Sequence, residues 1–123
     1  MVDGEGYVSV VGRKKEIIIR GGLNIAPREI EELLAAFDEV ERVAVVGLPD
    51  ERLGERVCAC VVLQSGRVLT FSTMVERLRA TGLATYKLPE RLELLPHLPT
   101  TPSGKVQKHR IVRQLVDADK VAP

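Results

Sequence analysis

The chain has 123 residues, 45% of them hydrophobic and 28% charged, with a formal net charge of +1. This composition predicts one soluble globular domain, and the interleaved, nearly balanced charges exclude an electrostatic footprint for nucleic acid. No apolar run approaches the ~20 residues of a membrane span and no signal peptide opens the chain, so we expect a cytoplasmic protein without a membrane span.

The first two predicted strands are expected to form a β-hairpin. Tyr7–Val11 alternates β-branched and aromatic residues, and Glu16–Arg20 contains three consecutive isoleucines. The segment Gly12–Lys15 lies between them and carries three successive cations. Taken alone, such a run of charge is typical of a solvated hairpin tip.

Two adjacent glycines then interrupt the second strand, and a helix follows. Gly21 and Gly22 allow positive φ angles and let another molecule approach the bare backbone closely. We expect Leu23–Asn24 to belong to the same break. Pro27 is well placed as the first helical residue. The helix would bury one apolar face, made of Ile30, Leu33, Leu34 and Phe37.

The middle of the chain predicts a pair of antiparallel strands, Glu41–Gly47 and Arg56–Leu63, because their connection is too short for a crossover helix. The second strand contains the only cysteines, Cys58 and Cys60. Alternate residues of a strand point to one face and do not easily form a disulfide. A zinc site would need more ligands than the two histidines supply, so we interpret both cysteines as small core residues and expect no metal site.

The next elements are a helix, a third strand and a closing helix. Thr70 or Ser72 is expected to cap a helix that runs to about Ala80. Glu90–Leu95 alternates charged residues with leucine and predicts the third sheet strand, and Lys108–Ala118 predicts the last helix. This order of elements predicts an α+β fold, in which the N-terminal hairpin precedes a small, mainly antiparallel three-stranded sheet packed with helices.

Between the third strand and the last helix lies a proline-rich loop, Leu98–Lys108. Its prolines stiffen the backbone, and Gly104 allows a turn directly before Lys105. Local composition favours an ordinary surface turn with a solvated lysine. The alternative is a rigid turn that delivers one ammonium group to anionic oxygens. A phosphate-binding loop of the G-x-x-x-x-G-K-[ST] type is excluded, since it needs glycine at Pro99 and serine or threonine at Val106.

Taken together, these segments resemble the C-terminal domain of the adenylate-forming enzymes, the superfamily of acyl-CoA synthetases, adenylation domains and luciferases. The likeness covers nearly the whole chain and rests on the order and spacing of short motifs. These motifs are Gly6–Tyr7, Gly12–Glu16, Arg20–Ile25, Pro27–Glu31, Gly47–Asp50, Gly54–Glu55, Tyr86–Pro89 and Pro102–Lys105. The resemblance implies two half-reactions. A carboxylate attacks the α-phosphate of Mg-ATP to give acyl-AMP and pyrophosphate, and a thiol then displaces AMP.

The resemblance also implies roles for single residues. Lys105 corresponds to the catalytic lysine, which contacts the nucleotide and stabilises the charge that develops on the α-phosphate. Arg13 corresponds to the arginine at the ribose of ATP or AMP. Lys15 corresponds to the hinge about which the domain swings between its two catalytic orientations. Gly21 and Gly22 correspond to the face along which the pantetheine arm of CoA passes.

We expect the chain to depart from the family by lacking the N-terminal domain, which would supply the phosphate loop, the acyl pocket and the acid that holds Mg²⁺. We therefore divide it into a hinge region with the hairpin, residues 1–20, and a mobile C-terminal domain, residues 21–123. Two smaller departures are Glu39, where proline is common, and Glu16, where aspartate is frequent. The chain alone is expected to be inactive.

Three functions stay open at this point. The first is the C-terminal domain of an ATP-dependent acyl-CoA synthetase, and Gly82–Arg91 is most similar to ligases for short, cyclic or aryl acids. The second is an adenylation enzyme that loads an acyl carrier protein instead of CoA. In both, the main partner is the enzyme's own N-terminal adenylation domain. The third is a free-standing, non-catalytic module that binds a partner or completes an enzyme in trans.

Overall fold

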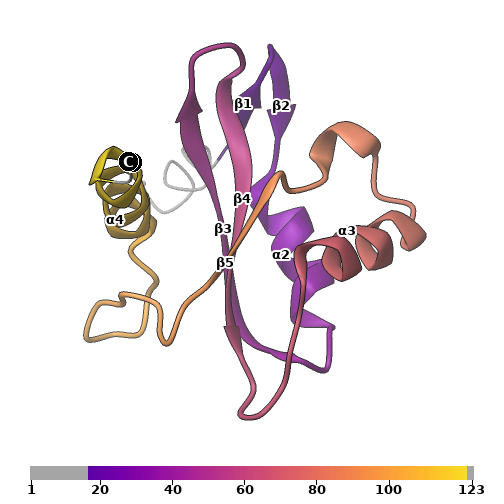
Figure 1. Ribbon diagram of the computed structural model, residues 1–123, viewed down its shortest axis with the longest axis vertical. Helices are drawn as coiled ribbons and strands as arrows, with labels where there is room; N and C mark the ends of the chain where they lie inside the picture. The colour runs from indigo at the N-terminus through magenta and orange to yellow at the C-terminus, as the bar shows by residue number, and fades with distance from the viewer. Residues whose placement is uncertain (1–16, 122–123) are drawn as a thin grey trace, which may run out of the picture.

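The computed structural model describes residues 17–121, and Figure 1 shows a twisted sheet with helices on both sides. The elements in chain order are β1 (Ile18–Arg20), β2 (Leu23–Ile25), α2 (Pro27–Ala35), β3 (Val40–Asp50), β4 (Gly54–Leu63), α3 (Phe71–Ala80), the 3₁₀ turn η1 (Thr85–Lys87), β5 (Arg91–Leu94) and α4 (Lys108–Val121). The predicted α+β class is confirmed. The predicted strand Tyr7–Val11 lies outside the described residues.

The long antiparallel pair β3–β4 forms the centre of the molecule, as the sequence predicts. Its register places Ala44 opposite Cys60 and Val46 opposite Cys58. The connection is short, and the Asp50 carboxylate stabilises it by accepting the backbone N–H groups of Arg52 and Leu53, each at 2.9 Å. These bonds, the one from Leu53 above all, lower the pKa of Asp50.

The sheet has five strands, not the three that the sequence predicts, because the β1–β2 hairpin joins it at the edge of β4 that β5 also occupies. β1 pairs with the start of β4 in antiparallel fashion, at Arg20 and Gly54. β5 pairs with residues 58–61 of β4 and runs parallel to them. The third predicted strand is therefore present but parallel, since the segment that contains α3 carries the chain back before β5 begins.

The hairpin at the start of the described residues is β1–β2, which pairs Ile18 with Ile25 and Arg20 with Leu23. The expectation that Leu23–Asn24 belongs to a break in the strand is wrong, because both residues lie in β2. Gly21 and Gly22 have φ angles of 58° and 84°. Two successive residues with positive φ make a two-residue turn whose twist matches that of the flanking strands, so the glycines join two strands.

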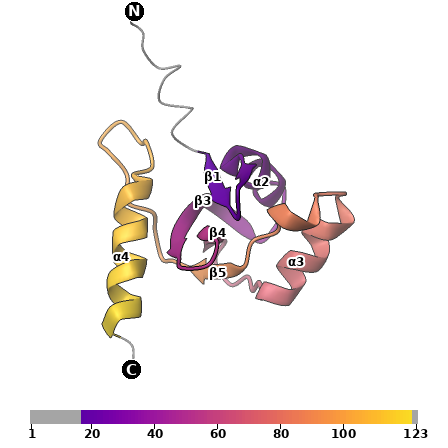
Figure 2. The same ribbon diagram turned by 90° about the horizontal axis from the view of Figure 1, so that it is seen from above.

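Apolar side chains cover both faces of β3 and β4, which explains why these strands read as almost continuous hydrophobic runs. Figure 2 shows α2 and α3 on one side of the sheet and α4 on the other. Val45, Val57 and Ala59 belong to the core beneath α2 and α3. Cys58 and Cys60 belong to the core beneath α4.

Both cysteines are free and fully buried, so their interpretation as core residues is confirmed. Their sulfur atoms are 3.9 Å apart. The contact with Cys58, together with burial, raises the pKa of the Cys60 thiol. Such a thiol is a poor nucleophile at neutral pH, which fits a packing role.

The last helix is attached to the sheet by Ile111 and Leu115, which lie in the second core, and by an ion pair near its C-terminal end. Arg91 of β5 donates two hydrogen bonds to the Asp119 carboxylate, at 2.9 and 3.2 Å. Of the helices within residues 17–121, none combines the length and apolar character needed to cross a membrane.

Candidate functional site

The loop before α4 is a short β-hairpin with Lys105 directly after its turn. Thr101 and Gly104 close the turn, in which the Gly104 N–H donates to the Thr101 carbonyl at 2.8 Å. Gly104 has a φ angle of 93°, which a side chain would disfavour. The Thr101 N–H then donates to the Lys105 carbonyl at 2.8 Å. This is a type of three-residue hairpin loop in which a turn is followed by a left-handed glycine.

Side-chain hydrogen bonds stiffen the same turn. The Thr101 hydroxyl accepts the Lys105 N–H at 3.1 Å and lies 2.9 Å from the Ser103 hydroxyl. One residue further out, Thr100 and Val106 form an isolated β-bridge. Lys105 is thus held through its main chain alone, so its side chain is free to move without changing the loop.

The side chain of Lys105 is exposed, and it makes no ion pair with any residue that the structure describes. The nearby Lys108 differs, because it lies 2.8 Å from Glu31. A hollow of about 430 Å³ lies beside the loop. Among the residues that line it are Lys105, Gln107, Val112, Ile17, Ile18 and Glu55. The arrangement presents one ammonium group beside a mostly apolar hollow, where an anion can approach it.

The turn at Gly21–Gly22 forms the second candidate site. A Cβ atom added at Gly22 would meet nothing within 4 Å, whereas one at Gly21 would contact Leu53 at 3.5 Å. The main chain at Gly22 is therefore bare and open to a ligand. The Gly21 N–H donates to the Leu53 carbonyl at 2.7 Å, which ties the turn to the connection between β3 and β4.

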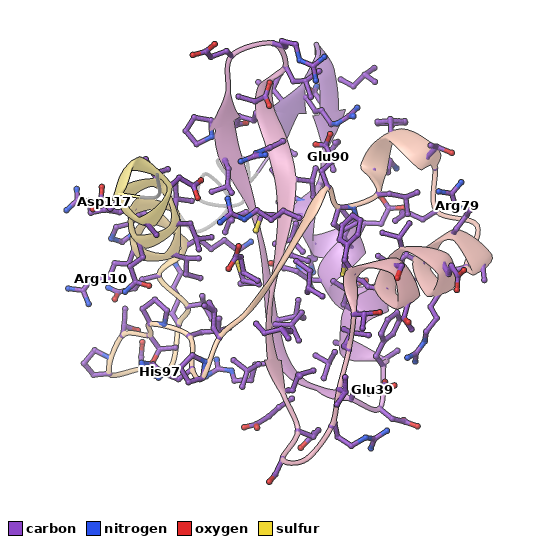
Figure 3. All side chains as sticks on the ribbon, in the orientation of Figure 1. Glu39, Arg79, Glu90, His97, Arg110 and Asp117 are labelled. Atoms are coloured by element: carbon purple, nitrogen blue, oxygen red, sulfur yellow. The ribbon has the colours of Figure 1, made fainter. Side chains whose placement is uncertain are left out.

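Glu90 holds the base of this turn from the side of β5 (Figure 3). Arg20 of β1 donates to one of its carboxylate oxygens at 3.0 Å, and the Val57 N–H of β4 donates to the other at 3.3 Å. Glu90 thus fills the gap between β1 and β5 along the edge of β4. The Arg20 hydrogen bond is the largest cause of a lowered pKa for Glu90.

A pH dependence follows from this contact. Because the pKa of Glu90 is lowered in the folded protein, its contribution to stability is present above the pKa of the unfolded chain. That contribution is lost as the pH falls through the lowered value. We expect Glu90→Gln to lower the free energy of unfolding at pH 7 by about 1 kcal/mol or less. The difference in unfolding free energy between this variant and the wild type should be smaller at acid pH. Urea denaturation at both pH values measures it.

Glu32→Gln is the matched control, since Glu32 pairs with Arg28 on one exposed face of α2. Both side chains are mostly exposed, so this variant should change stability less than Glu90→Gln. An equal loss for Glu90→Gln at neutral and acid pH would show that the lowered pKa is not the source of the stabilisation.

The two candidate sites lie far apart on the molecule. Figure 1 shows the tip of the β1–β2 hairpin at the upper end of the sheet and the segment between β5 and α4 at the lower end. The structure therefore describes Lys105, Gly21 and Gly22 but does not bring the lysine and the glycines together. Arg13 and Lys15, the predicted nucleotide contact and hinge, lie outside the described residues.

Two carboxylates near these sites, those of Glu55 and Glu90, are not predicted from the sequence to have a role. Glu55 lies within one of the motifs, and Glu90 is the first residue of a predicted strand, but neither position signals its partner. No group of three or more His, Cys, Asp and Glu side chains within the described part of the chain is arranged to hold a metal ion.

Comparison with known proteins shows which family this chain matches. Residues 29–105 match the family model for the AMP-binding enzyme C-terminal domain. The chain is 52% identical over 114 residues to the indoleacetate–CoA ligase of Aromatoleum aromaticum, covering 93% of this chain and 22% of the ligase. It is 42% identical over 111 residues to the salicyl-AMP ligase / salicyl-S-ArCP synthetase of Mycobacterium tuberculosis, covering 90% of this chain and 20% of that protein.

The fold is shared with solved structures. A fatty acyl CoA synthetase of Mycobacterium tuberculosis matches with a TM-score of 0.78 and 38% sequence identity, covering 85% of this chain and 20% of that protein. The chain therefore spans about a fifth of the length of these relatives.

Proposed function

The chain belongs to the family of AMP-binding enzyme C-terminal domains, and on that premise we propose that it is the mobile C-terminal domain of an ATP-dependent, AMP-forming acid–thiol ligase. The observation that carries the proposal is the Lys105 hairpin, which presents an ammonium group without an ion-pair partner among the described residues. An exposed cation on a turn that hydrogen bonds hold in place is suited to transient contact with an anion bound by another domain.

In the first half-reaction a carboxylate oxygen attacks the α-phosphorus of ATP, and the bond to pyrophosphate breaks. The nucleophile and the α-phosphate are both anionic, and negative charge develops on the phosphate oxygens. Lys105 reduces their repulsion and stabilises that charge. The Mg²⁺ that accompanies ATP would be held by the N-terminal domain, together with most of the nucleotide.

In the second half-reaction the sulfur of CoA attacks the acyl carbonyl, and AMP leaves. We assign the bare backbone at Gly21 and Gly22 to the passage of the pantetheine arm. Because this turn and the Lys105 loop lie at opposite ends of the sheet, one orientation of the domain cannot present both to one active site. A swing about Lys15 would exchange them, and Arg13 would contact the nucleotide ribose.

This assignment divides the chain into the hinge region at residues 1–20 and the mobile domain at residues 21–123. Its partners are an N-terminal adenylation domain, a carboxylic acid and CoA. The 52% identity to an indoleacetate–CoA ligase supports an aryl acid as the substrate. We further place the enzyme in the cytoplasm, where ATP and CoA are both available.

A carrier protein is the alternative acceptor, and one relative favours it. The salicyl-AMP ligase / salicyl-S-ArCP synthetase is named for transfer to a carrier, and it is 42% identical to this chain. The full-length enzyme should be assayed with acyl-AMP and either CoA or a phosphopantetheinylated carrier protein. Faster thioester formation with CoA would support the synthetase, and faster transfer to the carrier would support the alternative.

The proposal predicts that the 123-residue chain folds as a monomer yet releases no pyrophosphate from ATP with any carboxylic acid. The reason is that the proposal assigns the pockets for ATP and the acid to the N-terminal adenylation domain. Pyrophosphate release is measured with the chain and with the full-length enzyme under identical conditions. Acid-dependent release by the chain alone would overturn the proposal.

A further inference from the structure

The strand β1 leads into the Gly21–Gly22 turn, yet its main chain pairs with β4 over a very short stretch. β1 has three residues and pairs with β4 at a single position, Arg20 opposite Gly54. Its other neighbour is β2, which lies at the edge of the sheet. The position of the Gly21–Gly22 turn therefore depends on contacts other than a regular strand ladder.

One of these contacts comes from Glu55 of β4. Its Oε1 atom accepts the main-chain N–H of Ile19 at 2.8 Å, one residue before the pair that joins β1 to β4. The carboxylate thus takes the place of a main-chain acceptor. Hydrogen bonds to an ionised acceptor are stronger than those between neutral groups, which suits a strand with few other bonds.

The other oxygen of the same carboxylate is confined by β3. A Cβ atom added at Gly47 would lie 2.9 Å from Oε2 of Glu55 and 3.2 Å from Cγ2 of Ile18. At a distance under 3.0 Å one of the two groups must shift, and the end of the glutamate side chain is the part free to do so, so a side chain at position 47 would displace the carboxylate. Gly47 therefore leaves the space that Glu55 needs in order to reach Ile19.

We propose that Glu55 is a positioning residue for the thiol half-reaction, which holds β1 and thereby the main chain of the Gly21–Gly22 turn, and that Gly47 makes room for it. This inference rests on the proposed function, since it assigns the turn to the passage of the thiol substrate. It goes beyond that function because it gives Glu55 a role through its hydrogen bond with the backbone of Ile19, which neither half-reaction by itself requires.

Amide hydrogen exchange of the 123-residue chain, followed by NMR, tests the positioning without any activity. In Glu55→Ala we expect the Ile19 amide to exchange about tenfold faster, the scale of losing one charge-assisted hydrogen bond. The Gly21 amide should follow it, while the amides of Val46 and Cys60 in the central pair stay unchanged. Glu55→Gln keeps an acceptor oxygen and should restore most of the protection.

Gly47→Ala supplies an independent variant, because it disturbs the carboxylate without removing it. Alone it should accelerate exchange at Ile19, and it should add little in the Glu55→Ala background, where the crowded carboxylate is gone. Unchanged exchange at Ile19 in Glu55→Ala would overturn the proposal. An equal increase throughout the sheet would also overturn it, since Glu55 would then have only a general role in stability.

The kinetic test uses the full-length enzyme. Glu55→Ala should raise the KM for CoA about fivefold to tenfold and reduce pyrophosphate exchange much less, because the change displaces the thiol face. A loss of pyrophosphate exchange equal to the loss of thioester formation would overturn the role in the thiol step. If the wild-type enzyme makes no thioester with CoA, the proposed function fails instead, and the exchange data still decide whether Glu55 holds the turn.

Discussion

Lys105→Ala in the full-length enzyme should slow acyl-AMP formation by about 10²-fold or more, the scale of losing a group that stabilises charge in the transition state. The ammonium is needed while the carboxylate approaches the α-phosphate and negative charge develops there. Thioester formation from supplied acyl-AMP should be nearly unchanged, because in that orientation the loop has left the active site. The two rates are measured separately, by pyrophosphate exchange and by acyl-AMP consumption.

The structure makes this variant easy to interpret. The loop is held by the main chain of Lys105 and by the hydroxyl of Thr101, both of which the alanine variant keeps. Arg110→Ala is the matched control, since it removes another exposed cation two residues inside α4. It should leave both rates unchanged. Equal losses in the two half-reactions of Lys105→Ala would contradict the assignment of this lysine to adenylation.

The second large effect is expected from Gly22→Leu, which should damage the opposite half-reaction. Transfer of the acyl group to CoA should fall by about 10²-fold, the loss that a displacement of about 1 Å near a reacting centre can cause. Acyl-AMP formation should be preserved. Apart from the adjoining residues, no atom in the described part of the chain lies within 4 Å of a Cβ atom at this position, so we expect obstruction to arise with the thiol substrate.

A matched control separates obstruction from backbone strain. Gly66 has a φ angle of 77°, close to the 84° of Gly22, and a Cβ atom there would also meet nothing within 4 Å. Gly66→Leu therefore introduces similar strain, about 1–2 kcal/mol, in the connection between β4 and α3. It should lower stability to a similar extent without a selective loss of thioester formation. If both variants reduce acyl transfer equally, the role of Gly22 is wrong.

Features set by local chemistry could be predicted from the sequence. Pro27 begins α2, and the Thr70 hydroxyl accepts the Thr73 N–H at 3.2 Å as the N-cap of α3. Both follow from the free main-chain N–H groups at the start of a helix: a hydroxyl oxygen can accept one of them, and proline at the first position has none to leave unpaired. The alternation around Cys58 and Cys60 likewise fixes which side chains share a face of the strand.

Features that join distant segments could not be predicted. Glu90 and Arg20 are 70 residues apart, and Glu55 and Ile19 are 36 apart. A charged residue beside a strand is usually solvated, so its partner becomes evident only from the folded chain. The parallel direction of β5 has the same origin, because it depends on the path of the chain around α3 and not on the pattern of the strand itself.

The double-sided core has a consequence for the order of folding. During synthesis β3 and β4 leave the ribosome well before α4, which is the last element of the chain. Until that helix arrives, one face of the central hairpin exposes a contiguous apolar surface with both cysteines in it. Such a surface on a nascent chain invites aggregation and thiol oxidation. A stop codon that removed only α4 would therefore be expected to yield an insoluble protein, although every residue assigned here to the two half-reactions would still be present.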